Sequence, residues 1–110
     1  MKKAGIIRCR ETEEMCPGTA DFKAAGEGKG AFEETGPVEL VGFITCGGCP
    51  GKRAAYRAKM MVEKKGVEIV ALGSCIKKGN HAYPCPHFDE MLRAIEKQVG
   101  ENVKILDWTH

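Results

Sequence analysis

Short apolar segments alternate along the chain with segments whose apolar residues recur every three or four positions. The first pattern predicts four β-strands, at residues 3–9, 37–45, 67–75 and 102–109. The second pattern predicts three helices, at residues 21–25, 50–65 and 87–99. The resulting order β-α-β-α-β-α-β predicts an α/β fold, with an open, mostly parallel four-stranded sheet and helices on its faces.

The apolar residues also predict how these segments are covered. The run VELVGFI within residues 37–45 is almost continuously apolar, which favours a central strand covered on both faces. Apolar residues at helical spacing predict helix faces that pack on the sheet. These residues are Ala54, Ala58, Met61 and Val62 in the second helix and Phe88, Met91, Leu92, Ile95 and Val99 in the third. Thr19 is a candidate cap for the first helix.

Size and composition narrow the class of protein. A chain of 110 residues is expected to form one domain, covering residues 1–110. The net charge of +2 is too small to argue for nucleic-acid binding. No apolar stretch approaches the roughly 20 residues of a membrane span. The apolar stretch near Met1 is too short for a signal peptide, so we expect a cytoplasmic protein.

Cysteine content is the main departure from an ordinary composition. The chain has six cysteines, which are Cys9, Cys16, Cys46, Cys49, Cys75 and Cys85, and three histidines, which are His81, His87 and His110. In a reducing compartment this number of cysteines favours metal or redox chemistry over a disulfide framework.

The predicted strands place these residues together. Cys9 and Cys75 end the first and third predicted strands, Cys46 follows the second, and His110 follows the fourth. The other cysteines and histidines fall in the loops after strands. Because the carboxyl ends of parallel strands share one edge of a sheet, we expect the whole set at that edge.

The segment CGGC, residues 46–49, allows several chemistries. A C-x-x-C pair supplies two thiolates to one ion; thiolates with imidazole suit zinc, and thiolates alone suit an iron–sulfur cluster. A thiol–disulfide enzyme would use Cys46 as nucleophile and Cys49 as resolving thiol, with Lys52 and Arg53 favouring the thiolate. The start of the following helix could also attract an anion, although the segment does not match a phosphate-binding loop.

Six short motifs in order carry a family resemblance. They are IIRC, MCPG, FITCGGCPGKR, SCIKKG, PCPH and a terminal TH, and they extend from Ile6 to His110. With these motifs the chain resembles the CGGC-domain family, whose members are described as metal-binding proteins with zinc as the expected ion. The motif match implies metal ligands at Cys9, Cys16, Cys46, Cys49, Cys75, Cys85, His87 and His110.

The resemblance leaves several points open. Some members of the family have a further cysteine near the position of Asp21, which this chain lacks. His81 matches no motif of the family. The resemblance implies a metal ion as partner and assigns no catalytic residue, protein partner or oligomeric state.

Overall fold

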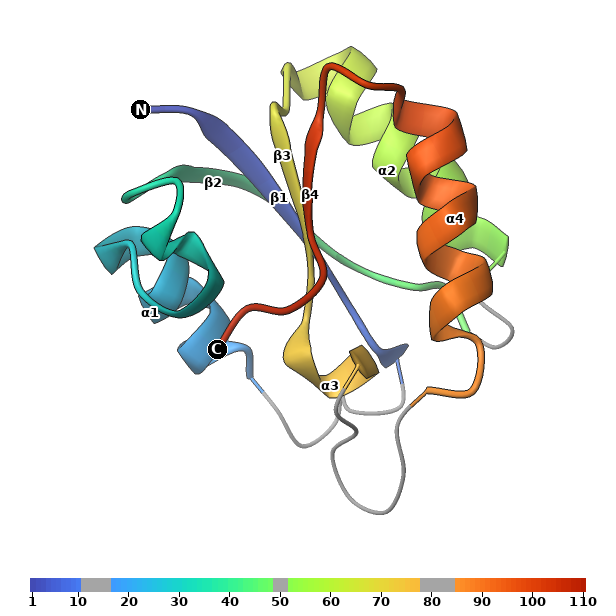
Figure 1. Cartoon of the computed structure of the whole chain (residues 1–110), viewed down its shortest axis with the longest axis horizontal. Coiled ribbons are helices and arrows are strands. Elements are labelled where there is room, and N and C mark those ends of the chain that lie inside the picture. Colours follow the sequence, from blue (N-terminus) through green and yellow to red (C-terminus); the bar gives the residue numbers. More distant parts are fainter. Residues whose placement is uncertain (11–16, 49–51, 78–84) are drawn as a thin grey trace.

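The fold is a parallel four-stranded sheet with helices on both faces (Figure 1). This computed structural model describes residues 1–10, 17–48, 52–77 and 85–110. The strands are β1 (Lys3–Arg8), β2 (Glu39–Thr45), β3 (Ile69–Leu72) and β4 (Lys104–Leu106). Their spatial order is β2-β1-β3-β4, and every neighbouring pair is parallel. The predicted α/β class and parallel sheet are confirmed.

The helices divide between the two faces of the sheet. They are α1 (Thr19–Glu27), the 3-10 helix η2 (Gly30–Glu33), α2 (Lys52–Lys65), α3 (Ser74–Lys77) and α4 (Phe88–Val99). In Figure 1, α2 and α4 lie on one side of the sheet and α1 lies on the other, while α3 lies below the strands, at their carboxyl ends. No helix in the described part of the chain has both the length and the apolar character needed to span a bilayer.

Successive side chains of the central strands point to opposite faces of the sheet, and each face has its own apolar core. We call the one under α2 and α4 the cysteine-side core, and the one under α1 the α1-side core. The cysteine-side core contains Ile7, Cys46, Ala54, Ala55, Ala58, Met61, Val67, Val70, Leu72, Ile76, Met91 and Ile95. The α1-side core contains Ala4, Ile6, Ala24, Ala25, Ala31, Phe32, Val38, Ile69, Ala71 and Leu106. The predicted stripes of α2 and α4 pack in or against the first of these cores.

The first helix is longer than the sequence predicts. It covers Thr19–Glu27, and its N-cap is Gly18, with a φ of 79°, rather than Thr19. A Cβ on residue 18 would lie 2.7 Å from the ring of Phe43, so the turn needs glycine for both space and conformation. The glycine-rich run after α1 forms the C-cap at Gly28 and then η2, because positive φ at glycine ends one helix and allows the next turn.

The third strand is shorter than predicted, which corrects the placement of one cysteine. It ends at Leu72 rather than Cys75, because the chain turns at Gly73. The Gly73 N–H donates to the Ile7 carbonyl (2.7 Å), and the Gly73 carbonyl accepts from the Ile76 N–H (2.9 Å), which begins α3. Cys75 therefore lies in the short helix α3, just beyond the strand end. The fourth strand also shortens, to Lys104–Leu106.

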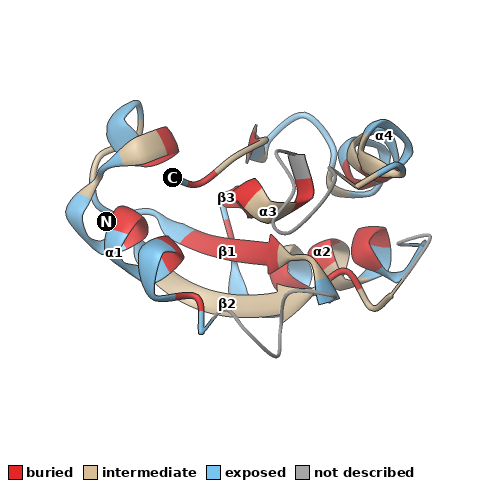
Figure 2. Ribbon diagram, turned by 90° about the horizontal axis from the view of Figure 1, so that it is seen from below, coloured by how far each residue is buried: buried red, intermediate tan, exposed pale blue. Residues whose placement is uncertain are grey.

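The second strand is not central, contrary to the prediction from its apolar run. It is the terminal strand of the sheet, and every residue from Leu40 to Thr45 is half-buried rather than buried. Figure 2 shows it at the margin of the molecule beside the largely buried β1. An apolar run is compatible with a strand buried on both faces. The order of strands in the sheet decides whether that strand is central or lies at an edge.

Candidate metal centre

Three neighbouring strand exits bring cysteines to one edge of the sheet. Cys9 directly follows β1, Cys46 directly follows β2, and Cys75 lies three residues beyond the end of β3. The parallel pairing continues past the strand ends, because the Cys46 N–H donates to the Arg8 carbonyl at 2.9 Å. The carboxyl edge of β2, β1 and β3 is therefore lined with thiol-bearing residues.

Cys9 and Cys75 are in direct contact. The Cys9 N–H donates to the Cys75 Sγ across 3.5 Å, although 66 positions separate the two residues in sequence. Backbone N–H donors to sulfur stabilise negative charge on it and are a standard feature of thiolate–metal sites. This contact joins two predicted ligands that lie just beyond the ends of two neighbouring strands.

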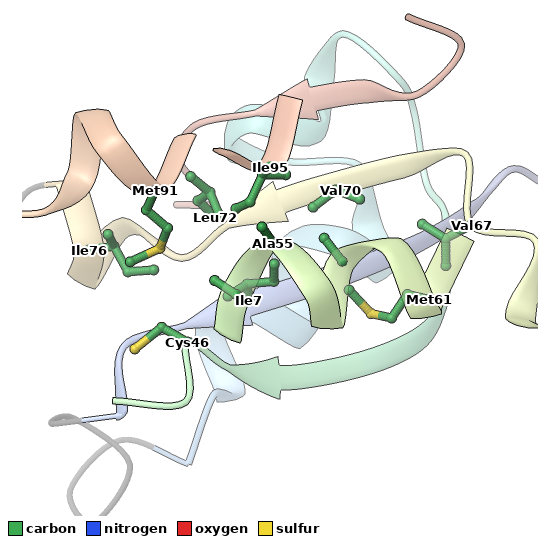
Figure 3. Packing of buried hydrophobic residues seen from close by; sticks show 12 residues of the cluster. Ile7, Cys46, Ala55, Met61, Val67, Val70, Leu72, Ile76, Met91 and Ile95 are labelled. Carbon is green, nitrogen blue, oxygen red and sulfur yellow. The ribbon is translucent and has the colours of Figure 1, made fainter. Parts of the chain in front are cut away.

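Cys46 lies at one end of the cysteine-side core. It is 5% exposed and belongs to the buried cluster itself. Figure 3 shows Cys46, Ile76 and Met91 at one end of this core and Met61 and Val67 at the other. The thiol of Cys46 thus lies at the same end of the core as the turn that carries Cys75.

Two glycines redirect the backbone after Cys46. Gly47 and Gly48 have φ values of 83° and 101°, which side chains with a Cβ rarely adopt. The Gly47 N–H donates to the Thr45 Oγ1 at 3.2 Å and fixes the start of the turn. The backbone of the CGGC segment therefore requires glycine at positions 47 and 48.

Cys85 approaches the same region from the start of α4. Its N–H donates to the Ile76 carbonyl at 2.9 Å, which ties it to α3 and hence to the turn of Cys75. His87 is the N-cap residue of α4, and its carbonyl accepts from the Met91 N–H at 2.9 Å. Cys9, Cys75 and Cys85 are half-buried and pack against the cysteine-side core, so every described cysteine lies on this side of the sheet.

His110 lies among oxygen-bearing groups rather than among thiols. Its Nε2 is 3.6 Å from the Oδ1 of Asp21, a carboxylate that is 4% exposed. The Thr109 hydroxyl donates to the same Asp21 oxygen, and the Ser74 Oγ accepts from the N–H groups of Thr109 (3.0 Å) and His110 (2.9 Å). We call Asp21, Ser74, Thr109 and His110 the polar clasp.

Sequence reasoning missed the polar clasp. Asp21 and Thr109 are 88 positions apart, and neither stands in a motif that pairs them. Ser74 of the polar clasp is followed directly in the chain by Cys75, one of the candidate thiol ligands. It therefore holds the turn that carries Cys75.

Basic side chains surround the CGGC turn. The Arg57 guanidinium donates to the carbonyl and the hydroxyl of Thr45, both at 3.1 Å. A Cβ on Gly47 would lie 2.8 Å from the Cβ of Arg53, so that side chain also borders the turn. Lys52 and Arg53 form the first turn of α2, where acidic residues are absent. Positive charge at this position would be favourable beside any negatively charged group that the turn holds.

The described residues supply part of a ligand set. Cys16, Cys49 and His81 lie outside them. Across residues 1–10, 17–48, 52–77 and 85–110, no three Cys, His, Asp or Glu side chains are grouped closely enough to hold a metal ion. The donors do fit a soft metal chemically, because they are thiols at the end of an apolar core. A complete site would take further ligands from the remaining cysteines.

Comparison with known proteins gives one family and two relatives. The family model for the CGGC domain matches residues 3–110. The uncharacterized protein MJ0582 of Methanocaldococcus jannaschii is 38% identical over 116 residues, covering 98% of this chain and 86% of that protein. The uncharacterized protein MJ0766 of the same organism is 35% identical over 54 residues, covering 49% of this chain and 79% of that protein. No solved structure gives a significant match.

Proposed function

This chain belongs to the CGGC-domain family, and on that premise we propose that it binds zinc through cysteine thiolates at the carboxyl edge of its sheet. Membership in the family supports metal binding without naming the metal. The choice of thiolates rests on one observation: each described cysteine lies in or against the same core, at the end where β1, β2 and β3 finish.

The proposed ligand set has a centre and a periphery. Cys46 and Cys49 form its centre as a C-x-x-C pair, and Cys9 and Cys75 join them from the neighbouring strand exits. The other candidates are Cys16, Cys85, His87 and His110. The contact between the Cys9 N–H and the Cys75 Sγ supports this choice, because it holds one thiol beside the exit of the next strand.

Zinc is favoured because the candidate ligands combine thiols with the imidazoles of His87 and His110. A structural zinc ion, when bound, contributes folding free energy by holding its ligands together. In this chain it would add a further link between the exits of three strands that backbone hydrogen bonds already hold side by side. An iron–sulfur cluster also takes thiolate ligands, so the same residues serve the alternative metal.

Metal analysis of anaerobically purified protein tests the proposal. We expect about one zinc per chain, in the absence of the visible absorption of an iron–sulfur cluster. Cys46→Ser should remove most of the bound metal, and Thr35→Val, a change remote from the thiols, should retain it. Protein that carries neither zinc nor iron, and whose thiols react freely, would refute metal binding.

A thiol–disulfide enzyme is the competing function. The basic residues at the start of α2 favour it, because cations beside a C-x-x-C pair are typical of thiol–disulfide enzymes. The burial of Cys46 at 5% exposure disfavours it, because an attacking thiolate needs access to its substrate. A Cys49→Ser variant that traps a mixed disulfide with a thiol substrate would support the enzyme over the metal protein.

A further inference from the structure

Three arginines from two elements of the fold border the CGGC turn, and we call Arg10, Arg53 and Arg57 the arginine cluster. Arg10 lies two residues beyond β1, and the other two lie in the first turns of α2. A Cβ on Gly48 would lie 3.1 Å from the Nη1 of Arg10. A Cβ on Gly47 would lie 3.1 Å from the Cδ of Arg53 and 3.4 Å from the Cζ of Arg57. Two adjacent glycines therefore bring the three side chains to one turn.

Arg57 is held in a fixed orientation and still has donors to offer. Its Nη1 donates to the carbonyl and the hydroxyl of Thr45, both at 3.1 Å. These bonds use only part of the guanidinium, because Nε and Nη2 carry N–H groups as well. Within the part of the chain that the structure describes, those two nitrogens donate to no protein group. Thr45 thus orients the guanidinium while its other N–H groups stay available to an acceptor from outside.

The arginine cluster has no carboxylate partner in the described ranges, where the ion pairs involve other residues. The contrast within α2 is direct, because Lys59 pairs with Glu63 one turn further on, with Nζ and Oε1 3.9 Å apart. This helix has six basic residues and one acidic residue, although the whole chain has 17 and 15. The uncompensated charge in the first turns of α2 therefore lies beside the CGGC turn.

Basic residues at this end also destabilise the helix itself. The N-terminus of a helix carries partial positive charge, so cations in the first turn are unfavourable there. The first turn of α2 contains Lys52 and Arg53 and no acidic residue. A bound anion would offset both the repulsion among the arginines and their repulsion by the helix end.

We propose that the arginine cluster binds a phosphate group on the solvent side of the CGGC turn. A tetrahedral oxyanion has oxygens that point in several directions, so it accepts hydrogen bonds from guanidinium groups of β1 and α2 together. A carboxylate is satisfied by one bidentate arginine, and three arginines exceed its need. The Gly48 N–H, which donates to no described group, is a further donor at the same place.

This site is distinct from the thiol ligands proposed above. Cys46 is 5% exposed and lies at the end of the buried core, whereas Arg10 and Arg53 are exposed. The phosphate group therefore binds outside the core, and its binding does not rest on bound zinc. The ligand that carries it is either free phosphate or a small phosphate ester, because both present the same oxygens to the arginines.

Isothermal titration with inorganic phosphate at low ionic strength tests the proposal in the full chain. We expect about one phosphate per chain, with an affinity that falls as salt is added, because salt screens the charges. Arg10→Gln and Arg57→Gln should each weaken binding about tenfold. Lys64→Gln is the matched control: it removes the same charge from the last turn of α2, and it should change the affinity less than about twofold.

Arg10→Gln keeps the test valid if Arg57→Gln disturbs the turn that Arg57 supports. Arg10 is exposed, so its replacement removes a charge without opening the core. Arg57→Lys keeps the charge and loses the planar fork, and it should still weaken binding about threefold or more if the contact is direct. A wild type that does not bind phosphate would overturn the proposal. A loss for Arg10→Gln no larger than that for Lys64→Gln would overturn it as well.

Repeating the titration after zinc is removed with a chelator separates the arginines from the metal. We expect phosphate to bind with the same affinity. Phosphate that binds only while zinc is present would be held by the metal, and this result would overturn the proposal. Protein that binds phosphate and no zinc would support this site while refuting the metal site. Glycerol phosphate identifies the source: tighter binding than inorganic phosphate would support the site with an ester as its ligand, and weaker binding would support it with the free ion.

Discussion

The two faces of the sheet end in different chemistry at the same edge. The cysteine-side core ends in thiols, with Cys46 inside it and Cys9, Cys75 and Cys85 packed against it. Among the described residues, the α1-side core contains no cysteine, and the polar clasp of Asp21, Ser74, Thr109 and His110 closes its end. One face therefore offers soft ligands, and the other offers hydroxyl, carboxylate and imidazole groups.

The difference suggests separate roles, with the thiol end suited to metal binding and the polar clasp suited to holding the fold together. Thiols at the end of a core suit a soft metal. A buried carboxylate such as Asp21 requires partners, and the hydroxyl of Thr109 supplies one, so the clasp is first of all a device that fixes the chain. The faces meet at α3, where Ser74 and Cys75 are neighbours. Variants that affect one face only can test the division.

The largest effects on stability are expected from the central strand, because adjacent residues of β1 serve opposite faces. Ile6 and Ile7 are both fully buried, in the α1-side core and the cysteine-side core respectively. Ile6→Ala and Ile7→Ala should each lower the free energy of unfolding by about 2–5 kcal/mol. Urea denaturation of the metal-free protein measures both.

The same pair should differ in metal binding. Ile7→Ala loosens the core on which the cysteines rest, so we expect it to weaken zinc affinity more than Ile6→Ala does. A chelator competition assay on folded protein provides the comparison. Equal losses of affinity would show that the metal site depends on the whole sheet rather than on one face.

The second-largest loss of stability is expected from a change in the polar clasp. Thr109→Val removes the hydroxyl that Asp21 and Ser74 share, and leaves a buried carboxylate without that donor. We expect a loss of about 2–3 kcal/mol in unfolding free energy. Thr35→Val is the matched control, because the Thr35 hydroxyl bonds only local carbonyls, and it should cost less than about 1 kcal/mol. Equal losses of unfolding free energy in the two variants would show that the clasp stabilises the chain no more than a local hydrogen bond does.

Neighbouring residues of α3 allow a sharper separation. Cys75→Ser should weaken zinc affinity at least about tenfold, because it removes a proposed ligand, while changing the stability of the metal-free chain little. Ser74→Ala should do the reverse, since it removes a group bonded to both Thr109 and His110. Isothermal titration and thermal denaturation of both variants measure the two quantities. A similar profile for both would contradict the assignment of these residues to different faces.

The smallest effect is expected at His110. Its imidazole is 46% exposed and faces Asp21, so His110→Ala should cost at most about 1 kcal/mol of stability. Zinc affinity should stay within about threefold of wild type if thiolates hold the ion. A loss as large as that of Cys75→Ser would make His110 a ligand, as the family resemblance implies.

Local patterns predicted much of this arrangement. Alternating strands and helices indicated a parallel sheet, and the positions of Cys9 at the end of the first predicted strand and Cys46 after the second indicated a shared edge. These inferences are confirmed because they depend on residues close in sequence. The contact between Cys9 and Cys75 follows from the pairing of β1 with β3.

The rest depends on features that local patterns do not contain. The end of β3 at Leu72 is set by the Gly73 turn, which bonds back to Ile7 of the neighbouring strand. The pairing of Asp21 with Thr109 joins residues from opposite ends of the chain. The edge position of β2 follows from the order of strands, and its apolar run is the same for a central strand. Only the assembled structure shows these relations.

X-ray absorption at the zinc edge of the metal-loaded protein tests most directly whether the thiol face holds the ion. We expect a first coordination shell dominated by sulfur at about 2.3 Å, contributed by cysteines of the carboxyl edge. The shell should lose sulfur in Cys46→Ser and stay the same in His110→Ala. A shell dominated by nitrogen and oxygen at about 2.0–2.1 Å would contradict thiolate binding and place the metal at the polar clasp instead.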